Sequence, residues 1–276
     1  MKSTYSISSN VKELETDSEA ISKKGFDLID IKYANGVWFS AYGKNVGKAN
    51  TIINDDTTWK GEPTFAGFQA QIEDRREDGY ELTDVEYDDG YWVGIFSSNE
   101  GDSELIVAED GDDFEAQLLE LQDLDSSFSL EYQVLDIEYA DGLWVGVANR
   151  TSGDATYTFS EDYENFELEV QQQREDGLEL TNVEYVDGTW YSVFSELSGL
   201  SAYSPETHAD IDDFTDEILD YRSKGFDLVN IESVDNEWFG VYKENVDGTD
   251  DIITPSDIFD SPADVVIQRQ IIPQYL

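Results

Sequence analysis

The sequence contains no cysteine and only one histidine among its 276 residues. Without cysteine, the chain forms no disulfide and no thiolate metal site, and a Cys–His catalytic dyad is excluded. A serine triad would have to use His208, which lies among acidic loop residues, and no Gly-x-Ser-x-Gly motif is present. We therefore expect no catalytic residue and a protein that is not an enzyme.

Basic residues are also scarce: 16 lysines and arginines stand against 63 acidic residues, which gives a net charge of −47. Binding of nucleic acid normally depends on basic side chains that neutralise phosphates, so nucleic acid is excluded as a partner. No run approaches the roughly 18 apolar residues of a membrane span, and the N-terminal residues form no secretory signal. We expect a soluble protein that does not insert into membranes.

The acidic residues are spread along the whole chain and are not gathered in a tail. Such a charge opposes compaction at ordinary ionic strength, but molar salt shortens the Debye length to about 3 Å and screens separated charges. With 39% hydrophobic residues, the chain has enough apolar side chains for a packed core. This combination indicates a halophilic source, a haloarchaeon or a virus that infects one. An unusually acidic mesophilic protein is the alternative.

One segment recurs five times, starting near residues 25, 79, 129, 177 and 225. It is clearest in VEYDDGYWVGIF (85–96), IEYADGLWVGVA (137–148) and VEYVDGTWYSVF (183–194). The copies lie about 50 residues apart, and each carries one tryptophan. These tryptophans are Trp38, Trp92, Trp144, Trp190 and Trp238.

Each copy is predicted to be a β-hairpin, because an Asp-Gly or Asn-Gly pair between two strand-like runs supplies the positive φ of a tight turn. The turn glycines are Gly36, Gly90, Gly142 and Gly188, and Asn236 takes this place in the fifth copy. In the strand before one turn, Val85 and Tyr87 are expected to be buried and Glu86 to face outward. A small residue two places after every tryptophan suggests that neighbouring backbones approach closely there.

A weaker signature lies between successive hairpins: a strand, an acidic turn and an aromatic residue, as in YTFSEDYENF (157–166). The alternation in FELEV (166–170) favours a further strand. Residues 113–122 and 213–221 are rich in helix formers and have apolar residues three or four apart. A helix is the alternative for these two stretches, which we interpret as outer strands.

Four strands in about fifty residues, with one tryptophan and no recurring long helix, predict an all-β fold, a β-propeller of about five four-stranded blades. Residues 1–24 resemble the second half of a repeat and are interpreted as an extra N-terminal half-unit. The last repeat carries its own second half at 251–270. We expect one domain over residues 1–276. Five ββαβ-type units are the alternative if the acidic stretches are helical.

The repeat pattern L-x-D-[VI]-x-Y-x-[DN]-G-x-W-V-x-V resembles those of sialidase-like and photosystem-assembly-factor-like propellers, and similar blades occur in virion and tail proteins of viruses. The segments SEDYENF (160–166) and AEDGDDF (108–114) are degenerate forms of the Asp-box of these families, in which Ser160 and Asp162 match. In those families the box is a structural turn away from the active site, so the resemblance implies a fold and no catalysis.

One acidic or amide residue recurs at a fixed position of every repeat. The set is Asp30, Asp84, Asp136, Asn182 and Asn230. Equivalent positions of a propeller fall on a ring, whereas an enzyme site places different residues on different blades. We interpret this uniform ring as structural, with each side chain bonded to the backbone of its own blade. A sialidase also needs an arginine cluster, but Arg75, Arg174 and Arg222 precede the repeats and are expected at blade edges.

The sequence therefore predicts a non-enzymatic structural or interaction propeller of a halophilic system, in a virion (capsid- or tail-associated) or a cell-surface assembly. The expected partners are other proteins, in a homo-oligomer or larger assembly, or a host surface glycan or receptor. The alternative is a propeller that binds carbohydrate or hydrolyses glycosides, because paired carboxylates are abundant. No cofactor is expected, apart from diffuse binding of K⁺, Na⁺ or Mg²⁺ by surface carboxylates. We expect the protein in the virion or cytoplasm of a halophilic host.

Overall fold

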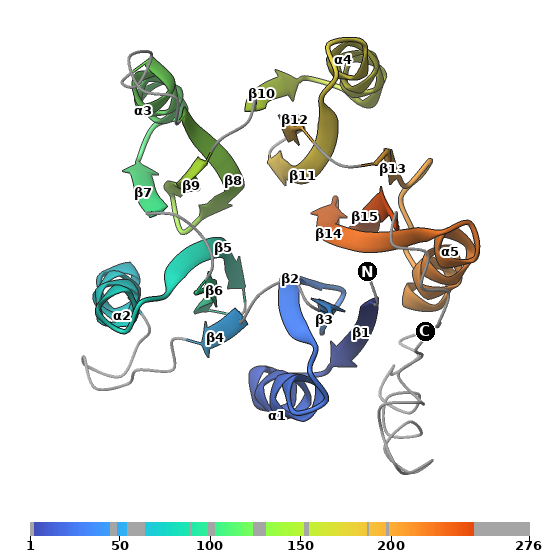
Figure 1. Cartoon of the computed structure of the whole chain (residues 1–276), viewed down its shortest axis with the longest axis horizontal. Helices are drawn as coiled ribbons and strands as arrows, with labels where there is room; N and C mark the ends of the chain where they lie inside the picture. Colours follow the sequence, from blue (N-terminus) through green and yellow to red (C-terminus); the bar gives the residue numbers. More distant parts are fainter. Residues whose placement is uncertain are drawn as a thin grey trace.

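The computed structural model describes residues 3–44, 49–53, 64–88, 90–98, 103–123, 131–151, 155–186, 188–196 and 199–245. Strands make up 50% of the described residues and helices 31%, which confirms a predominantly β fold. The described strands form five separate three-stranded antiparallel sheets. Figure 1 shows these sheets in chain order around a common centre, with a helix at the outside of each.

Each sheet and its helix form a unit made of a strand, a helix and a hairpin, in that order. Unit 1 contains β1 (Ser3–Ser8), α1 (Val11–Ser22), β2 (Asp27–Ala34) and β3 (Val37–Gly43). Unit 2 contains β4 (Ala49–Ile53), α2 (Phe65–Glu77), β5 (Glu81–Asp88) and β6 (Tyr91–Ser97). Unit 3 contains β7 (Ser103–Ala108), α3 (Gly111–Asp123), β8 (Glu131–Ala140) and β9 (Leu143–Thr151). Unit 4 contains β10 (Ala155–Ser160), α4 (Tyr163–Glu175), β11 (Glu179–Val186) and β12 (Thr189–Ser195). Unit 5 contains β13 (Ser201–Tyr203), α5 (Ile211–Ser223), β14 (Phe226–Val234) and β15 (Glu237–Glu244).

The second strand of each hairpin lies in the middle of its sheet, as in the order β1-β3-β2. The first strand of each hairpin is the inner strand, which lies next to the centre of the ring in Figure 1. The inner strands are β2, β5, β8, β11 and β14. Each inner strand contacts the inner strands of its neighbours, and β14 contacts β2, so the last unit meets the first.

The hairpin turns have the backbone geometry that the sequence predicts. Asn35 and Gly36 have φ values of 53° and 81°, and Asp235 and Asn236 have values of 50° and 67°. Two successive residues with positive φ match the twist of the flanking strands. Asn236 therefore adopts the conformation that glycine adopts in the other turns.

The prediction of four-stranded units is wrong, because the segments taken as outer strands are helical. Residues 113–122 and 213–221 lie within α3 and α5, and FELEV (166–170) lies within α4. The alternation in FELEV is also an i, i+4 repeat: Phe166 and Val170 are buried on one side of α4, and Leu168 is 58% exposed. The carboxylate of Asp162, within the Asp-box-like segment, caps α4 by accepting a bond from the Asn165 amide at 2.8 Å. The helical alternative was therefore the better interpretation of these stretches.

The interpretation of residues 1–24 as an extra half-unit is also wrong. β1 pairs antiparallel with β3, with Ser3 opposite Gly43 and Ser8 opposite Trp38. The N-terminal strand and helix therefore belong to the unit whose hairpin follows them. In the other four units, too, the strand and helix precede their hairpin in the sequence. The predicted second half of the last repeat, 251–270, lies outside the described residues.

Among the described helices, none has the length and apolar character needed to cross a membrane.

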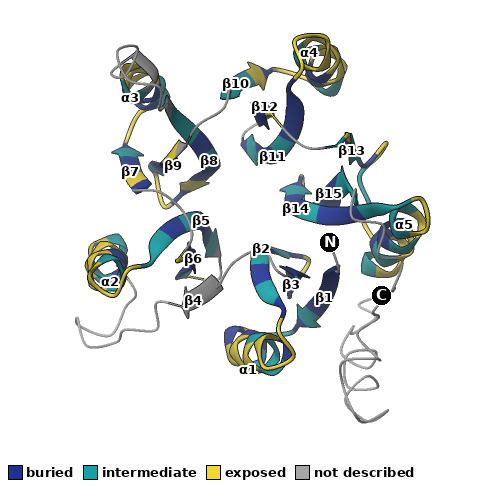
Figure 2. Cartoon of the chain, viewed as in Figure 1, coloured by how far each residue is buried: buried dark blue, intermediate teal, exposed yellow. Residues whose placement is uncertain are grey.

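The five repeat tryptophans are buried in five separate clusters, each of which joins two neighbouring units. Every tryptophan packs with residues on the middle strand of the next unit around the ring. These residues are Val93 and Ile95 for Trp38, Val145 and Val147 for Trp92, Val193 for Trp144, Phe239 and Val241 for Trp190, and Phe39 and Ala41 for Trp238. Burial of such a side chain contributes roughly 1.5–3 kcal/mol. Figure 2 shows the buried residues along the strands and the exposed ones on the outer faces of the helices.

The glycines two places after Trp92, Trp144 and Trp238 are crowded by side chains and not by neighbouring backbones. A Cβ at Gly146 would lie 2.9 Å from Cζ of Phe114, which comes from α3. At Gly94, a Cβ would lie 3.0 Å from Cζ of Phe68, from α2. In these two units the aromatic residue of the helix therefore occupies the space above the middle strand.

Candidate functional site

Two rings of polar side chains lie along the axis, and a β-bulge in every inner strand places them there. The pairing register shifts at Leu28/Asp30, and at the equivalent step of the other four inner strands. The extra residue puts Leu28 and Ile31 on the face that packs on the helix, and Asp30 and Lys32 on the other face. Because side chains two apart share a face and lie about 6.6 Å apart along a strand, the two rings are stacked.

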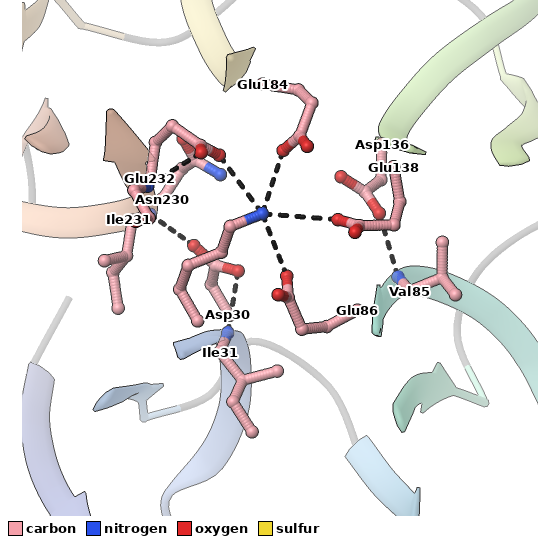
Figure 3. A network of polar contacts seen from close by, with 12 residues as sticks. Asp30, Ile31, Val85, Glu86, Asp136, Glu138, Glu184, Asn230, Ile231 and Glu232 are labelled. Carbon is pink, nitrogen blue, oxygen red and sulfur yellow. Dashed lines mark hydrogen bonds and ion pairs between the residues drawn. The ribbon is translucent and has the colours of Figure 1, made fainter. Parts of the chain in front are cut away.

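The first ring consists of one lysine and four glutamates at a single repeat position. The residues are Lys32, Glu86, Glu138, Glu184 and Glu232, all of them at most 7% exposed. Nζ of Lys32 lies 3.1, 3.2, 2.9 and 3.3 Å from the four carboxylates in the order of the chain. Figure 3 shows the four glutamates pointing to one central position from four strands.

Sequence reasoning missed this Lys32–Glu ring, and its prediction that Glu86 faces outward is wrong. Glu86 is 4% exposed. The available signal was that the position two residues after the Asp or Asn holds an ionisable residue in every repeat, on the same strand face. In a single strand, the alternation of apolar and polar residues predicts that Glu86 faces solvent. In a ring of sheets, the same face of the inner strand lies at the axis and is buried.

Burial dominates the electrostatics of the Lys32–Glu ring. It acts to lower the pKa of Lys32, but the four carboxylates, led by Glu138, outweigh it and hold that pKa well above its usual value. Burial, followed by repulsion from Glu232, raises the pKa of Glu184 well above its usual value. Burial is likewise the first cause of the raised pKa values of Glu86, Glu138 and Glu232. One ammonium thus lies among four carboxyl groups whose pKa values burial raises.

The second ring is the predicted Asp/Asn set, and three of its members bond the preceding unit. They accept a hydrogen bond from a backbone N–H of the inner strand before theirs around the ring. The pairs are Asp30 with Ile231, Asp136 with Val85 at 2.8 Å, and Asn230 with Val183 at 3.1 Å. The expectation that each side chain would bond only its own blade is therefore wrong, because these contacts link neighbouring units, including unit 5 to unit 1.

Asp84 departs from this pattern. It is 8% exposed, and its Oδ1 has no hydrogen-bond partner among the described residues. Burial, then repulsion from Asp136 and Asp30, raises the pKa of Asp84 well above its usual value. Burial also raises the pKa of Asp30 to about 7, against the hydrogen bond from Asp84 that lowers it. Both carboxyl groups therefore keep a proton to a higher pH than an exposed aspartate does.

A cavity of about 170 Å³ opens at the Asp/Asn ring. The five bulge residues and four members of the ring line it: Ile29, Thr83, Leu135, Thr181, Val229, Asp30, Asp84, Asn182 and Asn230. The hydroxyls of Thr83 and Thr181 donate to the carbonyls of Ile95 and Val193, both at 3.1 Å. In the described residues, no three histidine or acidic side chains are placed to hold a metal ion together.

Arginines lie at three junctions between units, away from the axis. Each donates to the serine that begins the next unit: Arg76 to the Ser103 carbonyl at 2.7 Å, Arg174 to the Ser201 carbonyl at 2.6 Å, and Arg222 to the Ser3 hydroxyl at 3.0 Å. A carboxylate accepts from the same serines, namely Glu81, Glu179 and Asp227. Arg174 and Arg222 are thus at unit edges as expected, but Arg76, and not Arg75, is their equivalent.

His208 is part of a polar cluster in unit 5. Its Nε2 lies 2.8 Å from Oε2 of Glu217, and Oε1 of Glu217 accepts from the hydroxyls of Ser204 and Tyr242. The carboxylate, and not the imidazole, receives the serine hydroxyl. This arrangement does not activate Ser204, because a triad needs the histidine next to the nucleophile.

Comparisons with models of known protein families and with curated proteins found no match to this chain. The function is therefore argued from the axis and its surroundings. The charged groups of the axis are bonded mainly to one another and to the backbone, and the cavity above them is small. Such an arrangement stabilises a ring of units and leaves room for a ligand of only a few atoms.

Proposed function

We propose that the chain is a five-bladed β-propeller, each blade having three strands and a helix, and that it serves as a non-enzymatic structural or interaction module of a halophilic assembly. The observation that carries the proposal is the Lys32–Glu ring, in which buried charges hold the inner strands of all five units together. Removal of buried charges from water is costly unless they are paired. The axial residues thus link the five units, and their charged groups are paired with one another.

The alternative of glycoside hydrolysis has less support. Asp30 and Asp84 are neighbouring buried carboxyl groups with raised pKa values, as in an acid–base pair, but the cavity of about 170 Å³ lies below the roughly 300–1,000 Å³ of most ligand pockets. The arginines Arg76, Arg174 and Arg222 bind serines at the unit junctions, so they do not gather around a substrate carboxylate.

The net charge of −47 supports the halophilic setting, because molar salt screens the repulsion of a surface this acidic. The resemblance of the repeats to virion and tail proteins favours a virus particle, or a cell-surface assembly, as the place of action. In both settings the module would work through contacts with other proteins, including copies of itself.

Sedimentation velocity in molar KCl, over a range of protein concentrations, tests this role. We expect a concentration-dependent oligomer. The variant Phe159→Thr should weaken self-association, because Phe159 is 47% exposed on β10, an edge strand of its sheet. The matched control is Leu119→Thr, which changes a side chain that is 55% exposed on α3. A strict monomer at all concentrations would contradict self-assembly.

A panel of fluorogenic glycosides at high salt tests the enzymatic alternative. We expect no turnover. Turnover that Asp84→Asn abolishes would overturn the non-enzymatic proposal, because that substitution keeps the shape of the side chain and removes its acid.

A further inference from the structure

The cavity at the Asp/Asn ring is lined by two buried acceptor oxygens that have no hydrogen-bond partner among the described residues. Asn182 donates from Nδ2 to Asp136 at 3.1 Å, which leaves its Oδ1 without a partner among the described residues. Oδ1 of Asp84 is likewise without a partner there. These two side chains are 7% and 8% exposed and line the same cavity. Buried polar atoms without partners are costly, so a ligand that satisfies both would be stabilised.

The remaining polar groups of the lining point to the same kind of ligand. The hydroxyl hydrogens of Thr83 and Thr181 are held by backbone carbonyls, so their oxygens present only lone pairs. A ligand that suits this lining must bring positive charge or donors. The acidic side chains around the cavity, Asp30, Asp84 and Asp136, favour a cation.

The other two carboxyl groups near the cavity are not free to bind a divalent ion. Both oxygens of Asp30 accept backbone N–H groups, from Ile31 at 2.7 Å and from Ile231. Both oxygens of Asp136 are also used, by Val85 and Asn182. The oxygens left for a ligand are therefore one amide oxygen, two hydroxyl oxygens and a single carboxyl oxygen, which are mostly those of neutral groups. Ca²⁺ and Mg²⁺ prefer ionised carboxylates, whereas neutral oxygens suit K⁺.

We propose that the cavity is a specific site for a monovalent cation, K⁺ in the first place, held by Oδ1 of Asp84, Oδ1 of Asn182 and the hydroxyls of Thr83 and Thr181. A volume of about 170 Å³ exceeds the roughly 30 Å³ that one water occupies in the liquid, so the ion keeps some of its waters. The site is distinct from diffuse binding at surface carboxylates.

The direct test is anomalous diffraction from crystals of the whole chain in which RbCl replaces KCl. We expect a rubidium peak in the cavity for the unmodified protein. Asp84→Asn should keep the peak, because an amide donates to Asp30 and presents the same free carbonyl oxygen. Asp84→Ala should lose it. Absence of a peak from the unmodified protein, or its loss in Asp84→Asn, would overturn the neutral-oxygen site.

The second test measures the midpoint of thermal unfolding at constant ionic strength, with N-methylglucamine chloride replaced by KCl, RbCl, NaCl or NH₄Cl. If the cation saturates its site, K⁺ should raise the midpoint by about 3–5 °C. Asp84→Asn and the surface control Glu167→Gln should keep this rise, and Asp84→Ala and Thr181→Val should lose most of it. NH₄⁺ distinguishes ammonium from metal ions as the preferred ligand. An equal rise in Asp84→Ala would contradict the proposal, and so would a larger rise from millimolar Mg²⁺ or Ca²⁺.

Discussion

The hydroxyl of Ser3 donates a hydrogen bond of 2.6 Å to the carboxylate of Asp227, although 224 residues separate them in the sequence. Arg222 donates to the same hydroxyl at 3.0 Å. The two ends of the described chain are thus joined by side chains, and no strand of one sheet is supplied by the other end. Closure of the ring is then supported by these polar contacts, by the axial contacts of Asp30 and Lys32 with unit 5, and by the apolar cluster around Trp238.

Ser3→Ala should therefore lower the free energy of unfolding by about 1–3 kcal/mol, because it removes a hydrogen bond to the 7% exposed carboxylate of Asp227. Denaturant titration in molar KCl measures the change. Ser223→Ala is the matched control, since that hydroxyl bonds an exposed carbonyl within its own helix turn. Equal losses in the two variants would show that the Ser3 contact has no special part in closure.

Arg76 and Arg75 are adjacent in α2, but only Arg76 donates to the next unit, at 2.7 Å from the Ser103 carbonyl. Arg76→Ala should cost about 1.5–3 kcal/mol, the usual range for hydrogen bonds to charged groups. Arg75→Ala should change stability by less than about 0.5 kcal/mol. Chemical unfolding of both variants in one buffer decides this, and a larger effect at Arg75 would mean that the assignment of the junction contact is wrong.

Lys32→Met should be the most damaging single change on the axis, because it leaves four buried carboxyl groups without their ammonium. Loss of one partner of a buried ion pair costs about 3–5 kcal/mol. The loss should be larger near pH 8 than near pH 5, where the glutamates, whose pKa values burial already raises, are protonated. Lys12→Met, on the exposed face of α1, is the control. A loss that does not depend on pH would argue that Lys32 matters only as a space-filling side chain.

The stability of the unmodified protein should also fall as pH rises. Burial raises the pKa of Asp30 from 3.8 to about 7 in the folded state. The folded state therefore binds a proton more tightly than the unfolded state does. The stability that this tighter proton binding provides is fully present below about pH 4 and is lost as pH rises through about 7. Asp30→Asn should flatten the pH profile of the free energy of unfolding in that window at fixed ionic strength. A profile as steep as that of the parent would exclude Asp30 as its source.

The repeats predicted the hairpins well, because a positive-φ turn and its flanking strands are encoded in a few adjacent residues. The helices were missed where short alternation coincides with i, i+4 spacing, as at Phe166 and Val170. The partner of the N-terminal strand was also missed, since a repeat can be divided at any point of its period. Both errors concern features that tertiary packing determines: whether a segment is a helix or a strand, and which hairpin a strand pairs with.

The axial site was only half predicted. The recurring Asp or Asn position was recognised, and a ring was expected from it. The contacts of that ring with the neighbouring unit, and the role of Lys32, depend on how the five sheets are placed around the axis. In the sequence, one lysine and four glutamates at the same repeat position look like variation at a surface site. The lysine lies at the centre of the four glutamates only because the five inner strands converge.

Gly146 provides a test of how the helices pack on the sheets. A Cβ there would lie 2.9 Å from Cζ of Phe114 and 3.1 Å from its Cε2, both parts of a rigid buried ring. Gly146→Ala should therefore cost about 1–3 kcal/mol through overpacking. Ser192→Ala, at the equivalent position of unit 4, should cost little, because the Ser192 hydroxyl is buried without a partner among the described residues.

The pair Gly146→Ala and Phe114→Leu then separates a steric cause from a general intolerance of the middle strand. Phe114→Leu alone loses buried area, but it also removes the ring atoms that the new methyl group would meet. The double variant should therefore be more stable than the sum of the two single losses predicts, with a coupling of about 0.5–3 kcal/mol. Strict additivity in a double-mutant cycle, measured by denaturant unfolding in molar KCl, would mean that the Phe114 ring does not account for the glycine at this position.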